Sequence, residues 1–376
     1  MIAERRMKRG LDWALVTAVL ILSAISLPMI ASATQAPSTG GFSLVKRQGV
    51  SIAIGILVAL AVMSVDYSDL ARFSRLIYVF NLGLLVAVTA AGRTTLGAQR
   101  WVQIGPVSLQ PSELAKLCMI ITLAASLSRR DGEEHGWAEI ISSFIHIAPA
   151  MLLVLKQPDL GTSLAFVAIT LGILVAAGAP GRILAPIVVA GLGSVIGAVV
   201  AHFRWGLPLP LEDYQLKRLI VFTNPGIDPL GSGYQLRQSI IAIGSGRLVG
   251  KGLFAGTQNQ LRFLPFQHTD FIFSVIGEEL GFIGGIAVLT LYLFVLWRGL
   301  RIAAMARDYF GALLSVGVVS MLAFHILINV GMTLGMMPVT GIPLPFMSYG
   351  GNSMITNMAA VGLLLNVYMR RHKIVF

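Results

Sequence analysis

The sequence carries little charge for its length, and this excludes most soluble folds. Only 12% of its 376 residues are Asp, Glu, Lys or Arg, whereas 56% are hydrophobic. Because a soluble domain has about 25% charged residues, we predict an integral membrane protein. Acidic residues are the scarcer kind, 17 against 28 basic ones, which gives a net charge of +11. The basic residues flank apolar runs, so we expect membrane lipid as their partner and no nucleic acid.

Cysteine is almost absent. The one cysteine, Cys118, lies inside an apolar run. A single thiol excludes a disulfide framework and a Cys/His metal centre. The sequence therefore predicts no dedicated metal site.

Long apolar runs, by contrast, are frequent, and ten of them approach the roughly 20 residues that a membrane-spanning helix needs. The first follows the basic segment MIAERRMKR. The ASA at 31–33 resembles a signal-peptidase site, but this run is longer than the apolar part of a usual signal peptide, so we interpret it as an uncleaved helix. The predicted fold is all-α, a polytopic integral membrane protein with ten transmembrane helices. They are expected near 11–30, 48–65, 76–92, 111–128, 138–155, 161–178, 183–203, 269–297, 311–333 and 351–369.

The placement of Lys and Arg predicts the orientation of these helices. Basic residues predominate in the short loops that a cytoplasmic N-terminus would place inside, as the positive-inside rule requires. Both termini are then cytoplasmic, and residues 1–376 form a single membrane domain. Residues 204–268 become a large extracytoplasmic loop between helices 7 and 8, which we expect to fold as short amphipathic helices on the membrane surface.

A carboxylate stands where this loop meets the eighth helix, in the stretch RFLPFQHTDFIFSVIGEELGFIG. Thr269 is the predicted N-cap, which puts Asp270 in the first helical turn, where the helix dipole favours an anion. Such a carboxylate can act as a general base, or it can simply cap the helix. His268 is a rival base. Farther along, Glu278 is expected near a polar cavity and Glu279 against a neighbouring helix.

The stretch RWVQIGPVSLQPSELAKL places two more ionisable residues inside a helix. Pro111 suits the first turn, so Glu113 and Lys116 fall on one helical face. Lys116 then lies roughly 7 Å inside the helix, where an ammonium needs a partner or a wet cavity. It is either an anion-binding group or half of a structural pair with Glu113. Trp101 is either an interfacial belt residue or a platform for a sugar.

Two further segments carry polar residues toward the same predicted outer side. Asp159 lies in KQPDLGTS, a turn between two spans, and is either a turn former or a functional acid. The stretch GSGRLVGKG in the large loop lacks the Walker spacing of a nucleotide site. Its cations suit a pyrophosphate or sugar phosphate, or else a solvated surface on anionic lipid. The basic candidates in and around this loop are Arg204, Arg247, Lys251 and Arg262.

A last polar segment precedes the final helix. The Pro- and Gly-rich stretch GMMPVTGIPLPFMSYGGNS is typical of irregular backbone at membrane depth, which is tolerated only where protein or water covers it. We expect it to line the same cavity, with Ser348 and Asn352 as polar contributors.

Together and in this order, these motifs resemble the RodA/FtsW family, the SEDS (shape, elongation, division and sporulation) proteins. The resemblance spans essentially the whole chain. The stretch DYQLKRLIVFTNPGIDPLGSGYQLRQSIIAIGSGRLVGKGLFAGTQNQLRFLP is similar to the RodA branch, with its GKG and GTQ elements. Two residues depart from the family pattern, Phe266 before the HTD and Asn352 after SYGG.

The resemblance implies a ten-helix glycosyltransferase that polymerises lipid II into β-1,4 glycan strands during cell elongation and rod-shape maintenance. Undecaprenyl pyrophosphate would leave on the outer face of the cytoplasmic membrane. Asp270 matches the catalytic Asp. Trp101, Glu113 and Lys116 match positions considered functional, and Asp159 matches a recurring acidic position. The implied partners are a class B penicillin-binding protein, which is the transpeptidase, and the elongation machinery.

Cofactor chemistry and two other classes of function stay open at this point. The sequence requires no cofactor, although a Mg²⁺ or Mn²⁺ ion on the pyrophosphate is compatible with it. The alternatives are a lipid II flippase and a non-catalytic membrane scaffold for a transpeptidase. A flippase needs polar groups through both leaflets, whereas the charged residues in and beside the predicted spans that form these motifs gather on the predicted outer side, with Glu278 and Glu279 the main deeper exceptions.

Overall fold

The structure is a computed structural model, and it describes most of the chain. The described residues are 10–34, 41–91, 93–95, 98–104, 107–129, 136–206, 215–216, 218, 221–222 and 225–371.

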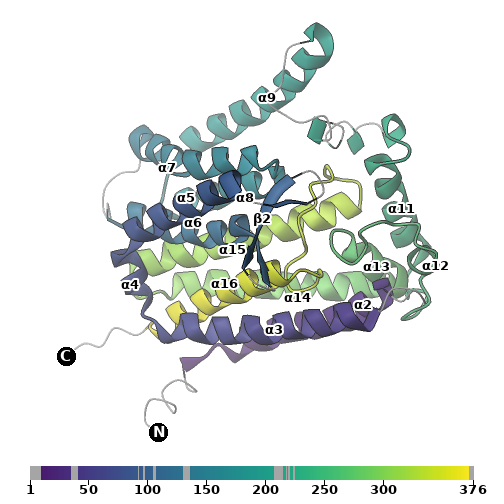
Figure 1. Ribbon diagram of the computed structural model, residues 1–376. Coiled ribbons are helices and arrows are strands. Elements are labelled where there is room, and N and C mark those ends of the chain that lie inside the picture. The colour runs from purple at the N-terminus through teal and green to yellow at the C-terminus, as the bar shows by residue number, and fades with distance from the viewer. Residues whose placement is uncertain are drawn as a thin grey trace.

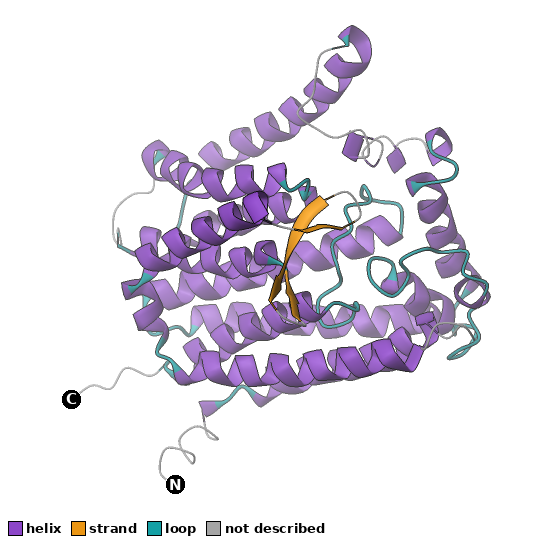
Figure 2. Cartoon of the chain, viewed as in Figure 1, coloured by secondary structure: helices purple, strands orange, loops and turns teal. Residues whose placement is uncertain are grey.

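Helices dominate the described residues and run side by side as one bundle (Figures 1 and 2). Each of the ten predicted ranges coincides with helical structure. The long helices are α2 (Trp13–Thr34), α3 (Gly41–Ser64), α5 (Ser74–Ala91), α6 (Pro111–Ser128), α7 (Trp137–Lys156), α8 (Leu160–Ala176), α9 (Gly181–Trp205), α14 (Gly281–Ala304), α15 (Tyr309–Thr333) and α16 (Gly351–Met369). The shorter ones are α4 (Tyr67–Arg72), η1 (Pro225–Ile227), α11 (Ser232–Ser245), α12 (Thr257–Gln260) and α13 (Ile272–Glu279).

The lengths and composition of these helices confirm an all-α, multi-pass membrane protein. Among the described residues, seven helices are long and apolar enough to cross a membrane. Two more apolar helices, Ser74–Thr89 and Leu160–Ala176, are shorter. The tenth predicted range corresponds to α16, which is not among the seven. The count of ten transmembrane helices therefore stays a prediction.

The centre of the bundle is formed by α6 and α15. In α6, 83% of the most apolar window is buried inside the protein, and in α15 67% is buried, against 22% in α3 and 12% in α9. Both central helices contact α8 and α16 as well as each other. The polar side chains Glu113 and Lys116 on α6 and His325 and Asn329 on α15 are therefore buried inside the protein.

The first described residue and the end of the last helix lie at one end of the bundle. Gly10, just before α2, is within van der Waals reach of Met369, the last residue of α16. The helices α11, α12 and α13 gather at the opposite end (Figure 1). This agrees with the predicted placement of both termini on one side and of the large loop on the other. Which side is cytoplasmic stays a prediction.

The predicted eighth span, 269–297, is broken in two. Helix α13 ends at Glu279, and α14 begins at Gly281, whose φ of +67° only glycine adopts without strain. A Cβ on Gly281 would also lie 2.2 Å from the backbone nitrogen of Gly250. The single continuous helix was wrong because the backbone of the large loop packs directly against the break.

The segment GSGRLVGKG makes this contact. The amides of Lys251 and Gly252 donate to the carbonyls of Glu278 and Glu279, both at 3.0 Å. In return, the amide of Phe282 donates to the carbonyl of Arg247 at 2.9 Å. The glycines therefore allow close backbone packing that supplies hydrogen bonds at the interrupted helix.

A small sheet was not predicted. Strands β1 (Arg93–Thr95), β2 (Ala98–Ile104) and β3 (Val107–Leu109) pair in antiparallel order β1-β2-β3. Its central strand carries Trp101, and the side-chain amide of Asn352 on α16 donates to the carbonyl of Ser108 at 2.8 Å. The sheet thus joins the start of α6 to the start of α16.

The large loop contains helices, as expected. One face of α11 buries Leu236, Ser239 and Ala242, while Ile240 and Ile241 are exposed. Apolar side chains therefore lie on both the buried and the exposed face of α11, and the predicted amphipathic character stays a prediction. The position of α11 on an outer membrane surface stays a prediction as well.

Candidate active site

Asp270 lies in a tight turn directly before α13. The amides of Thr269, Asp270 and Phe271 all donate to the carbonyl of Phe266, at 3.2, 3.1 and 3.4 Å. The helix begins only at Ile272, and its N-cap is Phe271, without a side-chain cap. The predicted N-cap, Thr269, was therefore wrong, because its hydroxyl donates back to Phe266 at 3.1 Å.

Asp270 is partly exposed, and its carboxylate rests against a glycine. The position that a Cβ would take on Gly341 is 3.3 Å from Asp270 Oδ2 and 3.4 Å from Arg218 Nη1. Arg218 Nη1 also donates to the carbonyl of Thr340 at 3.3 Å. An acidic and a basic side chain are thus brought together over the PVTGIPLP segment. Arg218 was not among the site candidates, although its motif, DYQLKR, had been noted.

The main chain around Asp270 is held by two other segments. The side-chain amide of Asn329 on α15 donates to the carbonyl of Asp270 at 2.9 Å and to that of Ile342 at 2.7 Å. The amide of Tyr349 donates to the carbonyl of His268 at 2.9 Å. Hydrogen bonds therefore join the HTD segment, α15 and the segment before α16.

His268 lies beside Tyr349, and their rings are 5.7 Å apart. Burial lowers the pKa of His268, which keeps the imidazole neutral and able to accept a proton. His268 therefore stays a rival base.

A second polar cluster lies between α6 and α15. Lys116 Nζ is 2.8 Å from Glu113 Oε1 and 3.2 Å from His325 Nε2, and all three residues are at most 5% exposed. Among the described residues, Glu113 Oε2 and His325 Nδ1 have no hydrogen-bond partner. The structural pair of Glu113 and Lys116 is therefore present, and anion binding by Lys116 stays a prediction.

His325 was missed in the sequence. It lies in the apolar run of α15 without a motif around it, although an ionisable residue inside a predicted span is itself a signal of function. His325 and Asn329 are four residues apart on α15, so one helical face contacts both Lys116 and the Asp270 segment.

Asp159 caps α8. Its carboxylate accepts from the amide and the hydroxyl of Thr162, at 3.2 and 3.0 Å, and lies 3.4 Å from the hydroxyl of Ser112 at the start of α6. This is the turn-forming arrangement that the sequence left as one alternative. A direct part in substrate binding stays a prediction.

The basic candidates of the large loop are spread out. Lys251 forms an ion pair of 2.7 Å with the buried Glu278, which excludes the polar cavity expected beside Glu278. Arg247 and Arg262 are exposed, on positive-φ turns. Arg204 lies in the last turn of α9, which leaves the bundle (Figure 1). Their predicted contacts with substrate are untested.

Other candidates have structural contacts. Glu279 accepts a hydrogen bond from Ser32 on α2, as expected of a residue facing a neighbouring helix. The hydroxyl of the buried Ser348 accepts from the amide of Leu344 at 2.8 Å and so shapes the turn before α16. Trp101 is partly exposed on β2.

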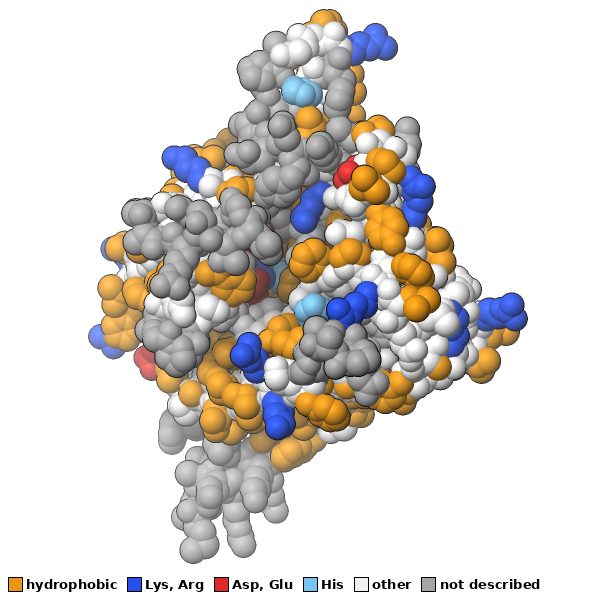
Figure 3. All heavy atoms as spheres, turned by 45° about the vertical axis from the view of Figure 1, so that its right-hand side comes forward, with side chains coloured by type: hydrophobic (Ala, Val, Ile, Leu, Met, Phe, Trp, Pro, Cys, Tyr) orange, Lys and Arg blue, Asp and Glu red, His pale blue; other side chains and the backbone are white. Residues whose placement is uncertain are grey.

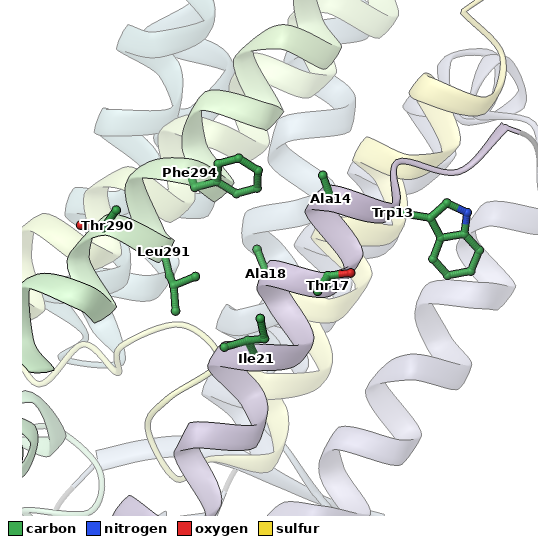
Figure 4. Close-up of a pocket in the computed structure, with 8 residues that line it drawn as sticks. All are labelled: Trp13, Ala14, Thr17, Ala18, Ile21, Thr290, Leu291 and Phe294. Atoms are coloured by element: carbon green, nitrogen blue, oxygen red, sulfur yellow. The ribbon is translucent and has the colours of Figure 1, made fainter.

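The surface is hollowed on the face that Figure 3 shows, and acidic and basic side chains lie in and around this hollow. A different groove, of about 580 Å³, lies between α2 and α14 (Figure 4). Its lining contains no titratable side chain, so it cannot perform acid–base chemistry. The lining residues are Trp13, Ala14, Thr17, Ala18, Ile21, Thr290, Leu291 and Phe294.

Comparison with known proteins gives a consistent match over the whole chain. Residues 11–373 match the model of the FtsW/RodA/SpoVE family, described as cell cycle protein. The chain is 38% identical to stage V sporulation protein E of Bacillus subtilis, with 96% of this chain and 97% of that protein covered. It is 37% identical to peptidoglycan glycosyltransferase MrdB of Escherichia coli, with 94% and 93% covered.

Solved structures agree with the sequence relatives. A chain in a structure titled for a peptidoglycan synthase complex that coordinates polymerisation and crosslinking superposes with a TM-score of 0.79 at 31% identity, covering 96% of this chain and 99% of that one. The rod shape determining protein RodA of Thermus thermophilus superposes with a TM-score of 0.70 at 29% identity, covering 96% and 98%.

Proposed function

The chain belongs to the FtsW/RodA/SpoVE family, the SEDS proteins, in its RodA branch, and from this premise we propose that it polymerises lipid II with Asp270 as general base. It is a peptidoglycan glycosyltransferase. The observation that carries the assignment of the base is the position of Asp270, a partly exposed residue on a hydrogen-bonded turn, whose carboxylate lies against Gly341 as the guanidinium of Arg218 does.

The proposed reaction joins two lipid-linked disaccharides. Asp270 accepts the proton of the 4-hydroxyl of an acceptor GlcNAc, and the hydroxyl oxygen attacks the anomeric carbon of a donor MurNAc. The bond from that carbon to the lipid pyrophosphate breaks, and undecaprenyl pyrophosphate leaves with the electron pair. Direct attack inverts the α-linked donor to a β-1,4 strand. Pyrophosphate is a good leaving group, so the second carboxylate of glycoside hydrolases is not needed.

Arg218 is the cation best placed to assist. A guanidinium can form two charge-assisted hydrogen bonds to a phosphate, and it lies close enough to Asp270 to hold the donor next to the base. Charge that grows on the pyrophosphate is then offset where it develops. Lys116 is enclosed in its cluster with Glu113 and His325, so in this arrangement it supports the site from inside the bundle.

The placement of the reaction is also part of the proposal. The protein lies in the inner membrane. The end of the bundle that carries Asp270 and α11 to α13 faces the exterior, and both termini lie in the cytoplasm. The crosslinking partner is a class B penicillin-binding protein. The similarity to a chain from a peptidoglycan synthase complex supports such a partner.

Polymer formation by the purified chain tests this function. The full chain is reconstituted in liposomes with lipid II and no other synthase, and glycan strands are separated by length, with and without the transpeptidase. We expect strands of several disaccharides or more. A scaffold forms none under either condition. A flippase forms none but moves fluorescent lipid II between the leaflets.

A further inference from the structure

Asn329 occupies an unusual place between two irregular segments. Its side chain is fully buried on α15, and its Nδ2 donates to the carbonyl of Asp270 at 2.9 Å and to that of Ile342 at 2.7 Å. Both carbonyls belong to residues outside regular helices. Buried carbonyls of this kind need a donor from elsewhere in the protein.

The chemistry of the amide fixes its orientation. An asparagine side chain has two N–H donors on Nδ2 and only an acceptor on Oδ1. Two carbonyls at hydrogen-bond distance require both donors of Asn329. Among uncharged side chains, only asparagine and glutamine carry such an NH2 group, and asparagine holds it on the shorter stem.

We propose that Asn329 is a positioning residue for the catalytic carboxylate of Asp270, an inference that rests on the proposed function. The amide of Asp270 is held by Phe266, and its carbonyl is held by Asn329. The side chain of Asp270 rests on Gly341, and the next residue, Ile342, is held by the same asparagine. One amide therefore sets both the backbone of the base and the surface that supports its carboxylate.

Loss of this amide leaves the peptide after Asp270 held only by the long bond from the amide of Phe271 to the carbonyl of Phe266, at 3.4 Å, so this peptide can shift. The carboxylate then leaves the position from which it can reach the acceptor hydroxyl. A misplacement of about 1 Å at a reacting group costs on the order of 100-fold in rate. Substrate affinity depends on other contacts and changes little, so the loss falls on kcat and not on KM.

The chain contains a matched control, Asn366 on α16. This residue is also fully buried, and its Nδ2 also donates to two carbonyls, those of Val62 and Val65, both at 2.7 Å. It lies near the end of the bundle that carries the termini, one turn before the C-terminus of α16. Removing either amide takes the side-chain donor from two carbonyls, but only Asn329 touches the Asp270 segment.

The experiment compares Asn329→Ala, Asn366→Ala and wild type, each as purified full chain in liposomes with lipid II. Thermal unfolding gives the stability of each variant, and initial rates give kcat and KM. For Asn329→Ala we expect kcat to fall about 100-fold with KM within about threefold of wild type. For Asn366→Ala we expect a similar loss of stability with kcat within about threefold of wild type. If Asn329→Ala does not accumulate, the milder change Asn329→Ser replaces it in the experiment. We expect Asn329→Ser to lower kcat as well.

Equal kcat in the two asparagine variants at matched stability would overturn the inference and leave Asn329 a structural residue. A rise in KM alone would overturn it as well, because that result indicates a lost binding contact. Asp270→Asn, measured in parallel, separates this failure from that of the proposed function. If Asp270→Asn is inactive while the Asn329 variants are normal, only the positioning role fails. If Asp270→Asn is fully active, the proposed base itself fails.

Discussion

Replacing Gly341 by alanine perturbs the carboxylate and the guanidinium of the candidate site at the same time. Gly341 has a φ of +75°, which costs an L-residue about 1–2 kcal/mol. The added Cβ would lie 3.3 Å from Asp270 Oδ2 and 3.4 Å from Arg218 Nη1. Both groups must retreat by a few tenths of an ångström, and the segment that carries Asp270 is held by other hydrogen bonds.

The expected loss of activity is larger than the loss of stability explains. We expect Gly341→Ala to unfold about 1–2 kcal/mol more easily and to lose about 10-fold to 100-fold in polymerisation rate, because the base and its cation are displaced together. Gly178→Ala is the matched control. Gly178 has a φ of +84°, but nothing lies within 4 Å of its Cβ position.

The assay is the initial rate of lipid II polymerisation per folded protein, with stability measured by thermal unfolding. The two alanine variants should be destabilised alike, and only Gly341→Ala should lose most of its rate. Equal rates in the two variants would refute the claim that the side chains of Asp270 and Arg218 must lie against Gly341 for the reaction to occur.

Two other side chains give predictions of their own. Lys116→Met should weaken the use of lipid II, measured as kcat/KM, because it leaves the carboxylate of Glu113 buried without its cation; unchanged kinetics would leave only a structural pair. Burial lowers the pKa of His268 below its ordinary 6.5, so the native state resists protonation, and stability is lost as pH falls below about 6.5. His268→Gln should therefore show a smaller drop in Tm between pH 7 and 5.5 than wild type, and an equal drop would exclude this contribution.

The sequence predicts the helices well because membrane burial depends on composition over long windows. The predicted range 111–128 is identical to α6, and 351–369 is identical to α16. The broken helix at Gly281 could not be predicted in this way. It depends on backbone contacts with a loop about 30 residues earlier in the chain, and hydropathy does not register such contacts.

The residues of the candidate site could likewise be predicted only in part. Asp270, Glu113 and Lys116 could be singled out because ionised groups beside apolar runs are rare. Asn329 and His325 could not, since one polar residue in an apolar helix gives no indication of its partner. Arg218 was one cation among several in a loop, and only the fold places it beside Asp270.

The most direct test is the rate of lipid II polymerisation by Asp270→Asn, which keeps the size of the side chain but removes the proton acceptor. Asp308 is the N-cap of α15, at the end of that helix away from Asn329. Asp308→Asn makes the same chemical change there and serves as the control. The account predicts a loss of at least about 100-fold for Asp270→Asn and a near-normal rate for Asp308→Asn. A normal rate of strand formation by Asp270→Asn would contradict it.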